Sequence, residues 1–156
     1  SYTSIPVPNA TGGSGDWISA DPTQSGRFAI MQRKGSDYEV FVTPDSGVTW
    51  TGPLAIAAPS ASKPWMDYGS NGVLGVMWKD TAAGNVYSAI LRPDATSFTT
   101  ALQVNQQPDT TGFRSGPGDD LSWITVDGDF AYVGWGDTRS GYTNPYFAKV
   151  PLSLYQ

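Results

Sequence analysis

The chain of 156 residues contains neither cysteine nor histidine. Without cysteine it can have no disulfide framework, no thiolate metal site and no thiol nucleophile. Without histidine it cannot build a Ser-His-Asp or Cys-His catalytic arrangement, and most kinds of zinc site are excluded as well. An enzyme with this sequence would have to work with carboxylates, tyrosine, lysine or arginine.

Charge is also scarce, since charged residues make up 15% of the sequence and the formal net charge is −5. No cluster of Lys and Arg could displace counterions from phosphates, so we expect neither nucleic acid nor an anionic membrane as a partner. No apolar run approaches the length of about 18 residues that a membrane-spanning helix needs, and no signal peptide is recognisable. A mature secreted protein and an excised fragment would both have this profile, and we expect an extracytoplasmic location.

Glycine, proline and aromatic residues, by contrast, are plentiful. The sequence has 18 Gly and 12 Pro, and aromatics account for 13% of it. This composition is typical of short strands joined by many turns and argues against long helices. A chain of this length suits one domain and can bury a real core. We therefore predict a single all-β unit over residues 1–156.

The most specific stretch is the octet 43–50, which has the form T-x-D-x-G-x-T-W. It follows an apolar strand-like run, so we expect it to form the turn of a hairpin. Asp45 can accept hydrogen bonds from the backbone N–H groups that follow it, and Gly47 can supply the positive φ that closes the turn. Thr43 and Thr49 flank that turn, and Trp50 is placed to pack beside the hairpin as an apolar anchor.

An internal repeat runs through the chain. Trp17, Trp65 and Trp123 open similar segments that are spaced 48 and 58 residues apart, around the period of about 40–50 residues found in propeller blades. Because the three tryptophans recur at equivalent positions, packing in the core between repeats is favoured over stacking on a sugar.

Each repeat continues with further apolar strands separated by polar loops. The second strands are expected at 28–32, 73–78 and 130–135, the third at 39–42, 86–91 and 146–150, and the fourth at 54–56 and 102–104. Residues 92–99 hold a degenerate copy of the octet, without its Gly and Trp. These apolar runs are expected of sheets that stack face to face.

The third repeat lacks a fourth strand, whereas an extra one is expected at residues 4–7, ahead of the first repeat. Twelve strands make three four-stranded antiparallel blades, and propellers typically close with 4–8 blades. We therefore predict half of a six-bladed ring, in which residues 1–8 complete a blade of a neighbour. An identical chain or a missing propeller segment would close the ring. The alternative is an open array of three sheets.

The octet resembles the Asp box, the bacterial neuraminidase repeat of sialidases and related β-propellers. Residues 63–67 with 74–78 resemble the blade opening of these proteins, and residues 135–141 resemble their W-x-D-x-R-x-G turn. Residues 78–81 form a partial copy that lacks the Arg. The resemblance covers nearly the whole chain and implies the fold, while the octet itself usually marks a blade rather than a site.

A sialidase resemblance implies an exo-acting glycosidase with a Tyr nucleophile, a Glu partner and an Asp acid/base. It also implies three arginines that hold the carboxylate of the substrate. Glu39, the only Glu in the chain, and Tyr142 are weak catalytic candidates, and none of these residues matches a catalytic motif position. The acid/base Asp and first Arg of the family would lie in a half that is absent here.

The face built from the 2–3 and 4–1 loops of the blades is expected to carry ligands, because its loops are longer and more charged. The ligand-binding candidates on this face are Arg33, Asp80, Arg114, Asp137 and Arg139. For Arg139 with Asp137 a structural ion pair is favoured over ligand contact, and for Asp80 a role in bracing its loop is favoured. Arg114, in a long Gly/Pro-rich loop, is the best ligand candidate.

No cofactor is expected. Asp119 and Asp120 could hold Ca²⁺ together with loop carbonyls, but a cap or turn role is favoured. The leading functional hypothesis is glycan recognition, with exo-glycosidase activity once the ring is complete. The alternatives are a non-catalytic interaction or scaffold propeller and a module that assembles by strand exchange.

Overall fold

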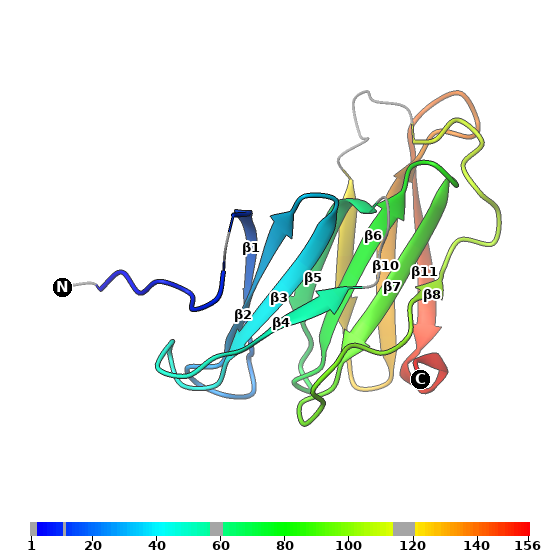
Figure 1. Cartoon of the computed structure of the whole chain (residues 1–156). Coiled ribbons are helices and arrows are strands. Elements are labelled where there is room, and N and C mark those ends of the chain that lie inside the picture. Colours follow the sequence, from blue (N-terminus) through cyan, green and yellow to red (C-terminus); the bar gives the residue numbers. More distant parts are fainter. Residues whose placement is uncertain (1–2, 11, 57–60, 114–120) are drawn as a thin grey trace.

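The structure is a computed structural model of the chain and describes residues 3–10, 12–56, 61–113 and 121–156. Within these residues it has eleven β-strands and one short 3₁₀ helix (Figure 1), so the all-β prediction is confirmed. No helix in this part of the chain is long and apolar enough to cross a membrane. The elements are β1 (Ser14–Ala20), β2 (Phe28–Lys34), β3 (Asp37–Thr43), β4 (Thr51–Ile56), β5 (Ala61–Tyr68), β6 (Leu74–Asp80), β7 (Asn85–Leu91), β8 (Leu102–Gln103), β9 (Ser122–Val126), β10 (Phe130–Asp137), β11 (Asn144–Pro151) and η1 (Leu152–Leu154).

The strands form three antiparallel sheets, and each sheet follows the chain as a simple meander. Sheet 1 has the order β1-β2-β3-β4, sheet 2 has β5-β6-β7-β8, and sheet 3 has β9-β10-β11. The second and third strands of every repeat lie where the sequence predicts them. The first strands contain Trp17, Trp65 and Trp123, but β1 and β5 begin three and four residues ahead of their tryptophans. The fourth strand of sheet 2 is short, but pairing extends past it because the Val104 N–H donates to the Val86 carbonyl at 2.8 Å.

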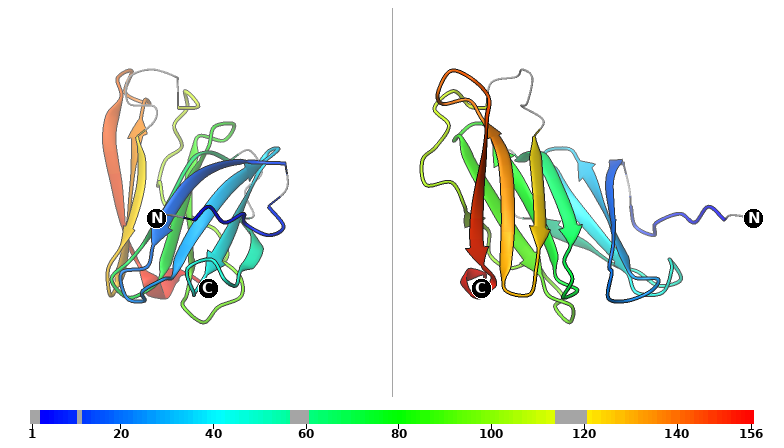
Figure 2. Two further views of the ribbon diagram at one scale, coloured as in Figure 1. Left: turned by 90° about the vertical axis from the view of Figure 1, so that its left-hand side faces the viewer. Right: turned by 180° about the vertical axis from the view of Figure 1, so that it is seen from behind.

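The three sheets stack face to face with sheet 2 in the middle (Figure 2). One apolar core lies between sheets 1 and 2, with Met31, Val40 and Val76 fully buried. A second core lies between sheets 2 and 3, where Met77 and Val133 are fully buried. The first strands β1, β5 and β9 are neighbours along one side of the stack. This is the arrangement of consecutive propeller blades.

The three repeated tryptophans occupy equivalent cross-strand positions. Trp17 pairs with Met31, Trp65 with Met77, and Trp123 with Gly134. Only Trp17 packs into the core between sheets as expected. Trp65 and Trp123 keep 44% and 37% of their surface exposed, so the prediction of packing in the core between repeats is wrong for these two.

The loops gather at two ends of the stack. The turn within residues 44–50 meets the turn between β1 and β2, where the Ser46 N–H donates to the Gly26 carbonyl at 2.8 Å. We call this the turn end. The opposite, loop end carries the β2–β3, β6–β7 and β10–β11 connections, as the blade topology predicts (Figure 1). These hairpins are tighter than predicted, because Arg33 and Asp37 already belong to strands.

The segment 3–10 belongs to no sheet in the structure. It runs out beside sheet 1, and Ile5 in it is half exposed. It approaches the turn end of sheet 1, where Ile5 lies close to Gly47. In the described residues sheet 3 therefore has three strands rather than four. Whether residues 4–7 complete a blade of another chain stays a prediction.

Candidate functional site

The turn end is organised by Asp45. Its carboxylate accepts hydrogen bonds from the Thr49 N–H and the Thr49 hydroxyl, both at 2.7 Å, and from the Thr43 hydroxyl at 3.0 Å. The Thr43 hydroxyl oxygen in turn accepts the Gly47 N–H at 2.8 Å. These bonds lower the pKa of Asp45, with the Thr49 hydroxyl contributing most. The Asp45 carboxylate and the Thr43 hydroxyl thus bond to groups of the turn itself, which makes the turn a structural element.

Trp50 anchors the same turn to sheet 1. Its indole N–H donates to the Gly47 carbonyl at 3.0 Å, and its ring packs edge-on against Phe28 with centroids 5.5 Å apart. Gly47 has φ of 90°, a conformation that side chains other than glycine rarely adopt. The octet thus fixes the β3–β4 hairpin.

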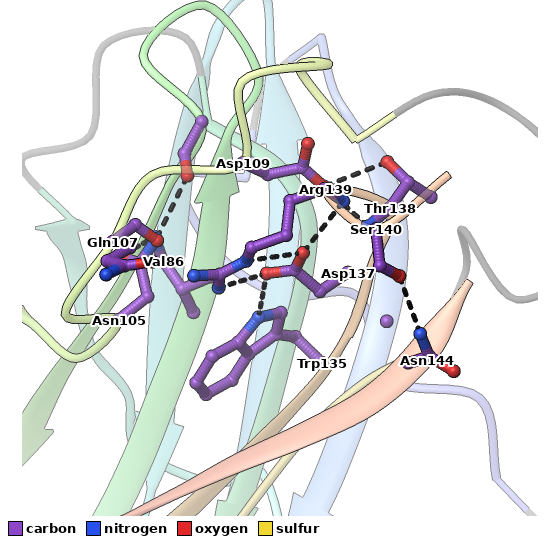
Figure 3. A network of polar contacts seen from close by, with 12 residues as sticks. Val86, Asn105, Gln107, Asp109, Trp135, Asp137, Thr138, Arg139, Ser140 and Asn144 are labelled. Carbon is purple, nitrogen blue, oxygen red and sulfur yellow. Dashed lines mark hydrogen bonds and ion pairs between the residues drawn. The ribbon is translucent and has the colours of Figure 1, made fainter. Parts of the chain in front are cut away.

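At the loop end, Asp137 and Arg139 form a bidentate ion pair (Figure 3). Asp137 is fully buried at the end of β10, and its carboxylate accepts the Arg139 Nε–H at 2.8 Å and an Nη2–H. The Trp135 indole N–H donates to the same carboxylate at 3.1 Å. The Arg139 guanidinium also lies 4.9 Å from the centre of the Tyr146 ring. The two side chains come from the W-x-D-x-R segment that the sequence singles out.

The charge of Arg139 is balanced within this pair. Burial raises the pKa of Asp137, but hydrogen bonds from Arg139 and Trp135 outweigh burial and lower it. The same bonds raise the pKa of Arg139. The pair with Asp137 occupies the Nε–Nη2 edge of the Arg139 guanidinium, so this arginine has fewer N–H groups left for a second carboxylate than a free one has.

A second carboxylate, Asp109, ties two loops together at this end. It is almost fully buried. One oxygen accepts the Thr111 N–H at 2.8 Å and the Thr111 hydroxyl at 2.5 Å. The other accepts the Thr138 N–H at 2.6 Å and the Thr138 hydroxyl at 2.8 Å. The sequence analysis missed this residue, although the Asp-x-Thr spacing at 109–111 is a known turn signal.

Lys79 joins sheet 2 to sheet 3 near the loop end. Its side chain is fully buried, and its ammonium donates to the Gly136 carbonyl at 3.2 Å. The ammonium also lies 5.0 Å from the centre of the Phe113 ring. The sequence places Lys79 in a charged loop, whereas the structure places it inside β6 and between sheets.

At the turn end a buried ion pair lies within the β1–β2 turn, and its arginine also reaches the segment that follows β7; sequence reasoning missed this pair too. Arg27 donates to Asp21 at 3.1 Å and to the Pro93 carbonyl at 3.1 Å. The guanidinium lies 5.5 Å from the centre of the Tyr68 ring. Arg27 comes from the β1–β2 turn, and its bond to the Pro93 carbonyl connects sheet 1 to sheet 2.

The remaining predicted site residues are spread over the three sheets. Arg33 in β2 is exposed and donates to the Gly35 carbonyl at 3.0 Å. Glu39 in β3 accepts from Gln32 at 2.9 Å and from Lys34 at 3.3 Å. Asp80, at the end of β6, accepts two backbone N–H groups of its own turn, from residues 82 and 83.

Tyr142 lies in the β10–β11 loop of sheet 3, with 80% of its surface exposed. Glu39 and Tyr142 are therefore on opposite sheets of the stack, and the described residues form no catalytic pair from them (Figure 1). Arg114, Asp119 and Asp120 lie outside the described residues. In the described part of the chain no group of three or more acidic residues is placed to hold a metal ion.

A groove of about 700 Å³ runs between the outer part of sheet 2 and β11. We call it the outer groove. At the loop end it is lined by Gln106, Gln107, Arg139 and Tyr146, and further along by Leu102, Val104, Leu154 and the β11 residues 147–151. It is the place where the structure brings a predicted site residue, Arg139, next to exposed polar side chains from another sheet.

No family model matches the chain, and no curated protein matches it. Among solved structures, the chain is similar to part of a mutant NanB sialidase from Streptococcus pneumoniae, with a TM-score of 0.49 and 14% identity over 88% of this chain and 23% of that one. For a structure described as NanB plus Optactamide the TM-score is 0.48 and the identity 15%, with the same two shares. The chain thus spans less than a quarter of the length of either structure.

Proposed function

We propose that the chain recognises neutral oligosaccharides at the loop end of the outer groove. The observation that carries the proposal is the lining of this groove, in which two exposed glutamines from the segment after β8 occur together with Arg139 and the partly exposed Tyr146 of sheet 3. A glutamine amide both donates and accepts hydrogen bonds, as sugar hydroxyls do. A concave surface with a few convergent polar groups beside an aromatic ring is typical of a ligand site.

The charge balance favours a neutral sugar over a sialylated one. Arg139 is already paired with the buried Asp137, which offsets the charge that would otherwise attract the carboxylate of a sialylated sugar. Moving the guanidinium away from Asp137 to bind such a group would leave a buried carboxylate without its partner, which is costly. Gln106 and Gln107 carry no charge and suit hydroxyl groups.

We propose binding without hydrolysis for this chain by itself. Glu39 is held by Gln32 and Lys34 on sheet 1, and Tyr142 belongs to sheet 3. An exo-glycosidase of the sialidase kind would need catalytic groups from the sheets that complete a ring. The proposed setting is extracytoplasmic, where glycans are displayed.

Isothermal titration of the chain with neutral and sialylated oligosaccharides tests this function. We expect neutral sugars to bind, the double variant Gln106→Ala/Gln107→Ala to lose that binding, and its melting temperature to stay unchanged. Gln24→Ala, an exposed glutamine at the turn end, is the matched control and should bind as the parent chain does. Absence of binding to any neutral oligosaccharide would contradict the proposal, as would a preference for sialylated sugars.

A second candidate function is a non-catalytic scaffold. It is favoured because the charged loop-end groups are occupied within the chain, since Arg139 donates to Asp137 and Asp109 accepts from Thr138 (Figure 3). In that case the two glutamines of the groove would be ordinary surface residues. The double glutamine variant separates the two candidates, because a scaffold role predicts no sugar binding before or after the change.

A further inference from the structure

Sheet 3 has an open edge at β11. In sheets 1 and 2 the third strand is paired on both sides, since β3 lies between β2 and β4 and β7 lies between β6 and β8. Among the described residues β11 pairs with β10 alone. Its side chains are correspondingly exposed, with Phe147 at 73%, whereas most side chains of β3 and β7 are buried. An unpaired edge of this kind is a template for another strand.

The backbone groups on this edge follow from the pairing of β10 with β11. Just beyond the two strands, the Leu152 N–H donates to the Asp129 carbonyl at 2.8 Å. In an antiparallel ladder, positions that bond to the partner strand alternate with positions that point away from it. Continuing the alternation along β11, the N–H and C=O groups of Phe147 and Lys149 face the open edge.

Two prolines agree with this assignment. Pro145 and Pro151 share the phase of Phe147 and Lys149, and a proline has no N–H to give to β10. Both prolines stand at positions of β11 that donate no N–H to β10. The open edge therefore offers two donors, at Phe147 and Lys149.

Strand β7 shows how the same edge is used in sheet 2. When β7 and β11 are aligned at their first residues, Val86 corresponds to Pro145 and Ile90 to Lys149. The carbonyls of Val86 and Ile90 accept hydrogen bonds, at 2.8 and 2.9 Å, from the segment that forms the outer edge of sheet 2. In β11 the same alternate positions point outward as in β7, and β11 is likewise the third strand of its sheet.

The outer groove lies along this edge. Its lining there is largely apolar and comes from both sheets, with Leu102 and Val104 on sheet 2 and Ala148 and Val150 on sheet 3. A strand laid against β11 would cover these side chains. Arg139 and the two glutamines line the opposite end of the same groove, at the loop end.

Residues 4–7 have the properties of such a strand. They are Ser-Ile-Pro-Val, they belong to no sheet, and Ile5 is half exposed. Ile5 and Val7 can both pair with a neighbour while Pro6 points to solvent, which is where a strand tolerates proline. The fourth strand β4, also at a sheet edge, contains Pro53 in the same way.

The spacing along the chain points to the same role. Val7 precedes Trp17 by 10 residues, and Ile56, the end of β4, precedes Trp65 by 9. Residues 4–7 thus stand before sheet 1 as β4 stands before sheet 2. Within one chain, however, they emerge beside sheet 1, and sheet 2 separates them from β11 (Figures 1 and 2).

We infer that residues 4–7 of a second copy of this chain add to the open edge of β11, and that the exchange is reciprocal. Each copy supplies the outer strand of sheet 3 in the other, so two chains form a closed pair with two equivalent strand additions.

The first test measures the mass in solution by light scattering for the full chain and two β11 variants. The parent chain is expected at twice the chain mass. Lys149→Pro removes one of the two N–H groups on the open edge. Position 149, like the positions of Pro145 and Pro151, donates no N–H to β10, so the pairing of β10 with β11 should survive and the variant should have the monomer mass. Lys149→Ala keeps the N–H and should stay a dimer. Circular dichroism and the melting curve show whether each variant is folded.

The second test identifies the strand that is exchanged. Because the chain has no cysteine, an Ile5→Cys chain can be mixed with a Phe147→Cys chain. The antiparallel register of β3 with β4 places these two residues opposite each other, so we expect a disulfide between the two different chains. The pairing of Val7→Cys with Lys149→Cys, which lie toward opposite ends of the added strand, is the control and should cross-link far less. A monomeric parent chain would overturn the inference, and so would a dimer that Lys149→Pro leaves intact. An Ile5→Cys/Phe147→Cys double variant that closes within one chain would overturn the role of the second copy.

Discussion

The carboxylate of Asp109 accepts two hydrogen bonds from Thr138, one from the backbone N–H at 2.6 Å and one from the hydroxyl at 2.8 Å. The two residues are 29 positions apart and belong to loops of different sheets. Each loop would otherwise present unpaired backbone groups in a buried place. This contact therefore holds the loop end of sheet 3 against sheet 2.

Replacing Asp109 by Asn should lower the free energy of unfolding by about 1–3 kcal/mol. The amide keeps one acceptor oxygen but turns the other position into a donor, which faces the donors of Thr111 or Thr138. Asp94→Asn, at an exposed turn, is the matched control and should stay within about 0.5 kcal/mol of the parent chain. Urea denaturation followed by tryptophan fluorescence gives both values. Equal stabilities of the two variants would contradict the role of Asp109.

The stability of the chain should depend on pH in the acidic range. Burial raises the pKa of Asp109, but the hydrogen bonds from Thr111 and Thr138 outweigh it, so the pKa is lowered on folding. Such a carboxyl stabilises the fold above its unfolded pKa of about 3.9 and loses this contribution as the pH falls through its folded pKa. The pKa values of Asp45, Asp127 and Asp137 are lowered as well.

We therefore expect the free energy of unfolding to be level near neutral pH and to fall below about pH 4. The difference between the parent chain and Asp109→Asn should shrink over the same range, because Asn does not titrate. Urea denaturation at a series of pH values measures both curves. A difference that stays constant into strong acid would show that the charge of Asp109 contributes nothing.

Gly134 should not tolerate a side chain. A Cβ placed there would lie 1.9 Å from Cε2 of Trp123, which covers the glycine from the neighbouring strand. Gly134→Ala must displace this ring and should cost about 1–3 kcal/mol. Gly128→Ala, where a Cβ would meet nothing within 4 Å, is the control and should be nearly neutral. The cost of Gly134→Ala should also diminish in a Trp123→Ala background, and thermal melts of the four variants complete the cycle.

Arg139 and Arg33 should respond differently to the same change. Arg139→Gln leaves the buried Asp137 without its bidentate partner and should destabilise the chain by about 1–3 kcal/mol. Arg33 is exposed and donates to a loop carbonyl, so Arg33→Gln should change stability by less than about 0.5 kcal/mol. Denaturation curves compare the two variants directly. A larger effect at Arg33 would contradict the assignment of Arg139 as a buried brace.

The fold could be predicted from the sequence because its signals are local. Apolar runs such as 86–91 and the octet 43–50 fix strands and a hairpin turn through neighbouring residues. The roles of Asp109 and Lys79 could not be predicted, since their partners Thr138 and Gly136 are distant in sequence and meet them only when sheets stack. Exposure of Trp123 escaped prediction for the same reason, because it depends on which faces another sheet covers.

The two prolines of β11 have a consequence for solubility. An exposed strand edge normally invites further chains to add without limit, which leads to fibres. With Pro145 and Pro151 bracketing two donors, this edge is too short and too interrupted to seed a long ladder. Concentrated solutions of the chain should therefore contain particles of finite size and remain clear.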